Sequence, residues 1–456
     1  MATISARKDL SRATCSRPSR GTTGLRDRPP NQRWAKQASA GPVFGLPRGV
    51  GSPILRLRPG ESMSSRISYM GTKHDLADRV ATIIAGCRPG RLLDAFAGMG
   101  AVADAHTGTR QVWTNDVQHF AYLAGRCRFT DPEGPVPALR MHYAAKPLFQ
   151  QNLELLKSQN VTAWAATAVM PTAPDFATFD RLFKEVADEP VTHEGAYACF
   201  TATYANAYFS LTQCAEIDSI RYALDTLRGR GVITQPQFDW GVLALGHAAQ
   251  RVANTTGHFA QFLTPSASNY KRIARQFKRP VFDQWLASMS ALKPAGTSQW
   301  RAENLATRSE CDALLPTISS CDDVGVVYCD PPYTDDQYSR FYHVWETLVL
   351  YDYPTVTGVG LYRPDRFRTA FSLRREVDVA FQTLVRDVAS TGADLVLSYP
   401  SNGLLHDIGG DPLDVLRTAY SNVQLVAEIK YNHSTMGASK GQATASVAEC
   451  LYVGRA

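Results

Sequence analysis

An apolar, β-branched run that ends in two consecutive prolines constrains this chain more than any other feature. Residues 324–329 are typical of a buried parallel strand, and Asp330-Pro331-Pro332-Tyr333 follows at once. Two prolines cannot continue a strand ladder, so they predict a stiff, open turn. The turn would hold a carboxylate and an aromatic ring at the carboxyl edge of a sheet, where open α/β sheets bind ligands. A planar, amino-bearing base needs such a pair, although an ordinary proline-rich turn is the alternative for this segment alone.

A glycine turn after an earlier predicted strand also points to a ligand. Residues 92–96 lead into Gly98 and Gly100, which let the backbone approach a ligand and adopt positive φ. The spacing is not that of a dinucleotide fingerprint, so the turn alone is weak evidence. Residues 111–115 predict the next strand, which ends in Asp116. A carboxylate there can hold a ribose hydroxyl pair, and it is equally typical of the cap of a helix over residues 117–127.

Further apolar patterns extend the sheet and its helices. Residues 74–86 and 337–350 have helical spacing, and residues 395–399, 425–431 and 447–453 are candidate strands. Between residues 131 and about 298 strong strand runs are absent and helical periods replace them, as over residues 215–227. The pattern predicts an α/β domain that is split by a helical insert.

Four segments, in their order along the chain, resemble the D12-class, Dam-type N6-adenine DNA methyltransferases of the α group. The segments are Tyr69 to Lys73, Asp94 to Gly100, Asp116, and Asp330 to Tyr333. The resemblance covers most of residues 63–130 and 300–456 and is weak between them. It implies a Rossmann-like, S-adenosylmethionine-dependent methyltransferase sheet with helices on both faces, interrupted by a mainly helical target-recognition insert.

The resemblance also implies a role for each matching residue. Tyr333 would stack on a flipped adenine, while Asp330 and the carbonyl of Pro331 would accept its amino hydrogens. The implied catalytic residues are Asp330, Pro331, Pro332 and Tyr333, and the implied S-adenosylmethionine-binding residues are Tyr69, Lys73, Asp94, Phe96, Gly98, Gly100, Asp116 and Asp330. No metal is expected. Asn304 lies where family members often have Asp, and it receives little weight.

The first 62 residues differ from the rest. They contain twelve Lys or Arg and three Asp or Glu, are rich in Ser, Gly and Pro, and show no sustained apolar period. We expect a disordered basic extension, with Met63 as the start of the native protein; a basic arm that adds non-specific DNA affinity is the alternative. We expect residues 63–130 and 299–456 to form one catalytic domain around a target-recognition insert at residues 131–298.

Two features of the insert bear on nucleic acid. Lys271, Arg272, Arg275, Lys278 and Arg279 are predicted on one helix, where Lys271, Arg275 and Arg279 would line one face. Such a stripe is typical of phosphate contacts and equally of a solvated basic face. The aromatics Tyr204, Tyr208 and Phe209 and the segment 256–261 favour ordinary helical core, with insertion into a base stack as the alternative.

Composition adds expectations about environment and partners. No apolar run reaches the ~18 residues of a membrane helix, and nine scattered cysteines without metal-site spacing indicate a reducing cytoplasm. With the resemblance, we expect a cytoplasm of bacterial or phage type. Cys329 is expected to be strand filler. The resemblance implies double-stranded DNA as the partner, allows a cognate restriction endonuclease, and leaves a monomer as the default.

The sequence therefore predicts an adenine-specific, site-specific DNA methyltransferase that uses S-adenosylmethionine. Two alternatives remain: methylation of RNA or of another amino group, and an inactive relative that only binds DNA. By the resemblance, Asp rather than Asn or Ser at position 330 favours adenine. The long insert favours duplex DNA.

Overall fold

The computed structural model describes residues 76–432 and 446–456. The predicted basic extension, the Met63 start, and the segment with Tyr69 and Lys73 lie outside the described residues. None of the helices in the two described stretches combines the length and the apolarity that a membrane crossing requires.

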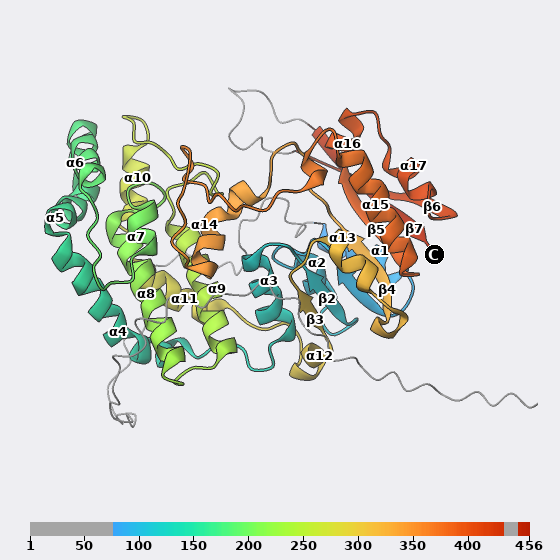
Figure 1. Cartoon of the computed structure of the whole chain (residues 1–456), viewed down its shortest axis with the longest axis horizontal. Coiled ribbons are helices and arrows are strands. Elements are labelled where there is room, and N and C mark those ends of the chain that lie inside the picture. The colour runs from blue at the N-terminus through green and yellow to red at the C-terminus, as the bar shows by residue number, and fades with distance from the viewer. Residues whose placement is uncertain (1–75, 433–445) are drawn as a thin grey trace, which may run out of the picture. The chain divides into compact units, whose positions relative to one another are not determined.

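One seven-stranded mixed sheet organises the structure (Figure 1). Its spatial order is β3-β2-β1-β4-β5-β7-β6; the first five strands are parallel, and β7 runs antiparallel between β5 and β6. The strands are β1 (Arg91–Asp94), β2 (Val112–Asn115), β3 (Leu305–Thr307), β4 (Val324–Cys329), β5 (Asp394–Pro400), β6 (Asn422–Asn432) and β7 (Ser446–Arg455). The predicted α/β sheet is confirmed, and β3 is a strand that the sequence did not indicate.

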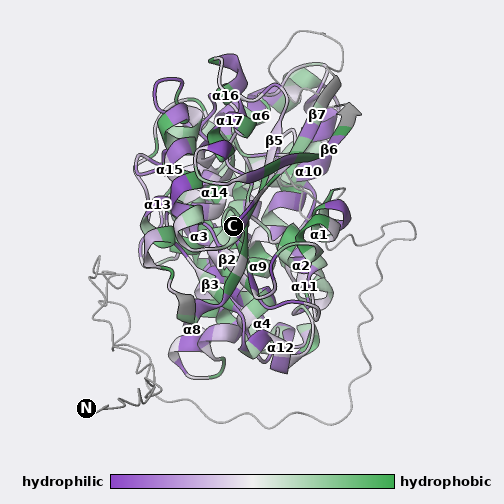
Figure 2. Cartoon of the chain, turned by 90° about the vertical axis from the view of Figure 1, so that its right-hand side faces the viewer, coloured by the Kyte–Doolittle hydropathy of each residue, from purple (hydrophilic) through white to green (hydrophobic). Residues whose placement is uncertain are grey.

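Helices cover both faces of this sheet, because the central strands are apolar on both sides. Leu92 of β1 and Val326 of β4 pack with Val80 on one face, while Leu93 and Val327 pack with Phe381 on the other. The first face carries α1 (Ala77–Ala85) and α2 (Ala101–Ala105), and the second carries α13 (Cys311–Leu314), α15 (Val377–Ser390), α16 (Leu404–Asp407) and α17 (Pro412–Arg417). Figure 2 shows hydrophilic and hydrophobic residues together along α15, as expected for a helix that covers a sheet.

The chain between β2 and β3 is helical. After α3 (His119–Gly125), a π-helical turn spans Arg126–Thr130. The helices that follow are α4 (Ala138–Gln159), α5 (Val161–Val169), α6 (Phe176–Asp188), α7 (Cys199–Tyr204), α8 (Leu211–Gly229), α9 (Gln235–Val252), α10 (Tyr270–Phe277), α11 (Val281–Ala291) and α12 (Ser298–Ala302). Figure 1 shows α4 to α11 grouped away from the strands. The helical character of the insert is confirmed, and its role in recognition stays a prediction.

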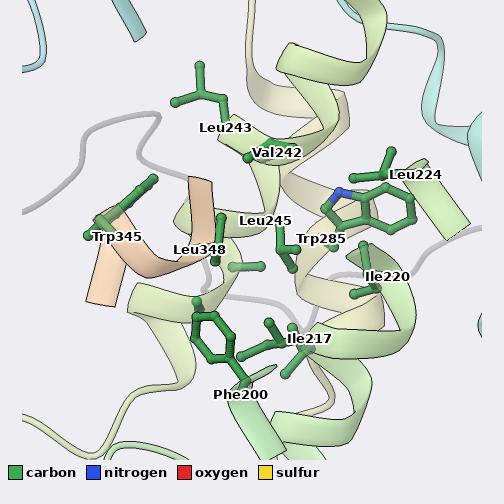
Figure 3. Packing of buried hydrophobic residues seen from close by; sticks show 14 of the residues in the cluster. Phe200, Ile217, Ile220, Leu224, Val242, Leu243, Leu245, Trp285, Trp345 and Leu348 are labelled. Carbon is green, nitrogen blue, oxygen red and sulfur yellow. The ribbon is translucent and has the colours of Figure 1, made fainter. Parts of the chain in front are cut away.

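The insert shares a core with α14 (Ser339–Leu350), the helix that follows the two prolines. Trp345 and Leu348 of α14 pack in one cluster with Phe200, Leu245 and Trp285 of the insert (Figure 3). Tyr204, Tyr208 and Phe209 belong to the same cluster and are fully buried, so their interpretation as core residues is confirmed. Beyond α14 a long connection without regular helix returns to α15, drawn in orange in Figure 1.

Candidate active site

A cavity of about 440 Å³ opens at the carboxyl ends of β1, β2, β3 and β4. Its lining includes one segment beyond each of these strands: residues 95–96, 116–118, 309–312 and 330–333. The opposite wall comes from residues 367–371 and from the first turns of α15. The volume lies within the range of small-molecule sites, about 300–1,000 Å³. The predicted turn therefore faces a cavity at the sheet edge instead of being sealed in the core.

A glycine turn follows the cavity-lining residues Ala95 and Phe96 after β1. Gly98 and Gly100 have φ of 51° and 75°, a backbone region that L side chains rarely adopt. A Cβ at Gly100 would lie 2.4 Å from the ring of Phe129, so the close approach also excludes a side chain. Neither glycine is among the residues that line the cavity; they set the path of the chain beneath it.

Asp116 joins the turns that follow β1 and β2. Its Oδ2 accepts a hydrogen bond of 3.0 Å from Gly98 N, and its Oδ1 accepts one of 2.9 Å from Gln118 N. The helix cap that the sequence allowed is not at this residue, because α3 begins at His119 with Gln118 as its N-cap. Burial raises the pKa of Asp116 to about 6, and these backbone bonds oppose that rise.

Asp94 lies below the cavity, at the end of β1, and is 1% exposed. Its Oδ1 has no hydrogen-bond partner among the described residues. Burial, then the charges of Asp330 and Asp116, raise the pKa of Asp94 to about 8. This carboxyl is therefore mostly protonated at neutral pH. Asp330 and Asp116 line the cavity itself, together with Glu310, Asp312 and Glu376.

The two prolines carry Tyr333 to the cavity wall. The ring of Tyr333 meets that of Tyr338 edge-on, with centroids 6.0 Å apart. Its carbonyl accepts a 2.8 Å hydrogen bond from Leu404 N, at the start of α16. Tyr333 and Tyr338 both line the cavity, together with Asp330. A carboxylate and an aromatic ring thus share one concave surface, as the sequence predicted.

The wall opposite the prolines is a segment that the sequence did not reveal. We call residues 363–372 the strap. Gln337 binds it with both ends of its side-chain amide: Nε2 donates to Thr369 O (3.1 Å), and Oε1 accepts from Thr369 N (2.8 Å). The Ser339 hydroxyl donates to Phe367 O (2.5 Å). The residues that follow Tyr333 therefore hold the wall that faces it.

Comparison with known proteins supplies the family. Residues 256–391 match the family model of the D12 class N6 adenine-specific DNA methyltransferases. This range contains β3, β4, the proline turn, α14, the strap and α15. The chain carries a D12 class N6 adenine-specific DNA methyltransferase domain. The resemblance proposed from the sequence is confirmed, and the fold is consistent with the Rossmann-like methyltransferases.

Curated relatives of the methyltransferase domain extend the match over most of the chain. Modification methylase LlaI of Lactococcus lactis subsp. lactis is 23% identical over 350 residues, which are 76% of this chain and 47% of that protein. Type II methyltransferase M.FokI of Planomicrobium okeanokoites is 22% identical, over 74% of this chain and 45% of its own length. Type II methyltransferase M.NlaIII of Neisseria lactamica is also 22% identical, over 74% of this chain and 85% of its own length. The chain thus spans about half the length of the first two.

The basic residues of the insert separate into two groups. Lys271, Arg275 and Lys278 line a hollow of about 460 Å³ beside α10, together with Pro171, Ala173, Tyr270 and Ala274. In the described part of the chain these three cations form no ion pair. We call them the basic hollow.

Arg272 and Arg279 instead point back to the protein. The guanidinium of Arg272 donates to Thr255 O (2.8 Å), and that of Arg279 donates to Arg251 O (2.7 Å). The predicted stripe through Arg279 is therefore wrong. The α10 helix ends at Phe277, and a residue before a proline, here Pro280, is pushed away from helical geometry.

Two further residues have structural positions in the methyltransferase domain. Asn304 joins β2 to the π-helical turn, because its Oδ1 accepts from Val112 N (3.0 Å) and its Nδ2 donates to Phe129 O (3.0 Å). Cys329 is fully buried in β4, and burial raises the pKa of its thiol, as expected of a residue that fills the strand.

Proposed function

We propose that this protein transfers a methyl group from S-adenosylmethionine to the N6 amino group of an adenine flipped out of DNA. One observation carries the proposal: within the family domain, Asp330 and Tyr333 line a cavity at the carboxyl ends of β1 to β4. Such an edge is where open α/β sheets bind ligands. A duplex hides its bases, so adenine must leave the stack to reach this cavity.

Asp330 and Pro331 would activate the amino group. The lone pair of an exocyclic nitrogen is delocalised into the ring, which makes the nitrogen a poor nucleophile. When Asp330 and the Pro331 carbonyl accept its two hydrogens, the lone pair becomes localised on nitrogen. The new N–C bond then forms as the donor's S–C bond breaks, and the charge that develops on nitrogen is opposed by Asp330. The surplus proton leaves to Asp330 or through it to water.

Tyr333 would hold the flipped base. Stacking of a base on an aromatic ring stabilises it by ~1–3 kcal/mol. This offsets part of the few kcal/mol that unstacking and unpairing cost. The edge-on contact with Tyr338 limits the positions open to the Tyr333 ring, so the stacking surface is set before the base arrives.

The residues beyond β1, β2 and β3 fit the bound cofactor. Phe96, Asp116 and residues 309–312 line the same cavity as Asp330. Gly98 and Gly100 do not line the cavity, and their positive φ sets the path of the chain that follows Phe96. When bound, S-adenosylmethionine supplies an electrophilic methyl group on a sulfonium. The roles of Tyr69 and Lys73 remain predictions, since both residues lie outside the described part.

The basic hollow would contact DNA phosphates. Three cations around one concave surface can displace condensed counterions from the DNA backbone. These contacts would position the duplex without reading its sequence. The relatives are named modification methylases or Type II methyltransferases. We therefore propose double-stranded DNA as the substrate and a restriction endonuclease as the partner to seek.

Methyl transfer by the full chain tests the proposal. Purified protein would be incubated with tritiated S-adenosylmethionine and mixed-sequence duplex DNA, and the hydrolysed product analysed for N6-methyladenine. Asp330→Ala should lower turnover by at least ~10²-fold while S-adenosylmethionine still binds. Asp335→Ala is the matched control, because Asp335 lies in the same turn, is exposed, and does not line the cavity.

Three outcomes would contradict the proposal. Near-normal turnover in Asp330→Ala would remove Asp330 from the chemistry. Transfer to RNA but not to DNA would replace the substrate. Binding of DNA with no transfer from wild-type protein, over a range of DNA sequences, would indicate a binding module without activity.

A further inference from the structure

The connection between α14 and α15 contains a short hairpin with an apolar tip. Thr357 and Tyr362 close it, with N–H···O bonds of 2.9 and 2.8 Å in the two directions. Inside it, Gly358 and Leu361 have φ of 72° and 52°. Val359 stands at the tip and is 75% exposed, the highest value among the large apolar side chains of the described residues. We call residues 357–362 the tip hairpin.

The tip hairpin is rigidly supported from below. The hydroxyl of Tyr208, a fully buried residue, lies 2.8 Å from Gly360 O and 2.7 Å from Phe259 O. The hydroxyl of Tyr362 donates to Ala260 O (2.5 Å). A Cβ at Gly360 would lie 2.6 Å from the same Ala260 oxygen, so the hairpin is seated closely on this segment.

This support gives a structural role to the aromatic residues that the sequence analysis singled out in the insert. The aromatic residues of segment 256–261 and of the Tyr204 cluster were candidates for insertion into a base stack, but Phe259 is 2% exposed and Tyr208 is fully buried. They cannot reach DNA. The Tyr208 hydroxyl and the Ala260 carbonyl instead hold the hairpin that presents Val359. A single exposed valine is unremarkable, but two tyrosine anchors beneath an exposed tip indicate that its position matters.

A series of side-chain contacts connects the tip hairpin to residues 330–333, which we call the catalytic turn after the role proposed for them. Ring contacts connect Tyr333 to Tyr338 (6.0 Å) and Tyr338 to Phe341 (5.9 Å). The guanidinium of Arg340 then lies 5.7 Å from the Phe341 ring centre and 5.9 Å from that of Tyr362. From Tyr362 the chain runs directly into the strap, whose Phe367 lines the cavity. Figure 1 shows this orange connection passing from the helical insert to the sheet.

Cations accompany the apolar tip. The guanidinium of Arg366 lies 4.6 Å from the centre of the Tyr362 ring, on which Arg340 also packs. Arg340 pairs with Asp336, whereas Arg366 pairs with no acid among the described residues. An apolar tip with a cation at its base is complementary to a nucleic acid: the apolar side chain suits the stacked bases, and the cation suits a phosphate beside them.

We propose that Val359 inserts into the DNA base stack beside the target and occupies the space that the flipped adenine leaves, while Arg366 contacts the adjoining phosphate. The inference rests on the proposed function and adds to it the element that stabilises the flipped state. Proteins that open a duplex commonly insert an apolar side chain between base steps. Here the tip and the strap belong to one continuous segment that follows the catalytic turn, and Tyr208 and Ala260 of the insert support the tip.

The test compares paired and unpaired targets. Once the recognised site is mapped by sequencing of modified bases, kcat/KM is measured on a duplex with the adenine paired and on one with an abasic site opposite it. Val359→Ala should lower kcat/KM about tenfold on the paired duplex, since it removes two methyl groups from the stack. On the abasic duplex, where the base leaves easily, the loss should shrink to within about twofold. Val359→Leu should behave like wild type.

The controls separate this inference from the function on which it rests. Val232→Ala changes another exposed valine, 48% exposed, in the turn between α8 and α9, and should leave both substrates unaffected. Equal losses by Val359→Ala on the two duplexes, or no loss on the paired one, would overturn the wedge while the methyltransferase stands. Failure of wild-type protein to methylate either duplex would overturn the proposed function itself, and the wedge with it.

Discussion

Substitution of Gly246 by alanine tests whether the helical insert and the catalytic turn are joined through one core. Gly246 lies in α9, and a Cβ built there falls 1.7, 2.3 and 2.4 Å from three carbons of the Trp345 ring. Trp345 belongs to α14, the helix that begins six residues after Tyr333. The ring must move by roughly 2 Å before an ordinary carbon–carbon separation of ~3.5–4.0 Å returns.

The expected cost follows from opposing effects. Alanine raises helix propensity over glycine, which favours the variant by about 1 kcal/mol. Overpacking of a core costs typically 1–3 kcal/mol, and an approach this close belongs at the upper end. The displaced ring also loses the 3.3 Å hydrogen bond from its Nε1 to Gln250, about 1 kcal/mol more. The free energy of unfolding should therefore fall by about 3 kcal/mol.

Equilibrium urea unfolding, followed by tryptophan fluorescence and circular dichroism, measures this change. Gly229→Ala is the control, because Gly229 ends α8 and a Cβ there meets no atom within 4 Å. That variant should be neutral or up to ~1 kcal/mol more stable. If Gly246→Ala is as stable as Gly229→Ala, then Trp345 does not pack on α9, and the proposed union of insert and catalytic turn is wrong.

Two further predictions concern charge. The pKa of Asp94 is about 8 in the folded protein, against an ordinary value of 3.8 that applies to the unfolded chain. Between these two pH values the folded state binds more protons than the unfolded state. The free energy of unfolding therefore falls as pH rises through this window. Asp94→Asn should flatten that dependence in unfolding measured at several pH values, and an unchanged slope would contradict the buried, protonated carboxyl. Joint substitution of Lys271 and Arg275 by alanine should reduce the slope of log K for DNA against log salt by about 2, and an unaltered slope would remove the basic hollow from the interface.

The strands and the catalytic turn could be predicted from the sequence because each depends on a short pattern of consecutive residues. A strand buried on both faces is a continuous apolar run, and the run over residues 324–329 ends in two residues that must break it. By contrast, β3 has three half-buried residues, too few to show a period. The helix α15 was missed although its buried Phe381, Leu384, Val385 and Val388 have helical spacing.

The strap and the tip hairpin could not be predicted, because long-range contacts between side chains and backbone define them. Gln337 and Thr369 are 32 residues apart, and Tyr208 lies 152 residues from Gly360. A hydrogen bond between a glutamine side chain and a distant backbone amide produces no periodic pattern in the sequence. The predicted basic stripe failed for a related reason: periodicity gave the face of the helix, but a proline placed its end before Arg279.

The placement of α14 gives the domain a mechanical consequence. Glu346 on this helix accepts a 3.0 Å hydrogen bond from Phe120 N, in the first turn of α3, which follows Asp116. Trp345, its neighbour, packs on α9 of the insert, and Gln337 and Ser339 at the start of α14 hold the strap. Cores have discrete packings and do not deform continuously. Any rearrangement of the insert that displaces α14 must therefore act together on the start of α3 beside Asp116 and on the two walls of the cavity. The proposed DNA contact of the insert and the proposed chemistry at Asp330 would therefore be coupled through one helix, with no separate linker needed between them.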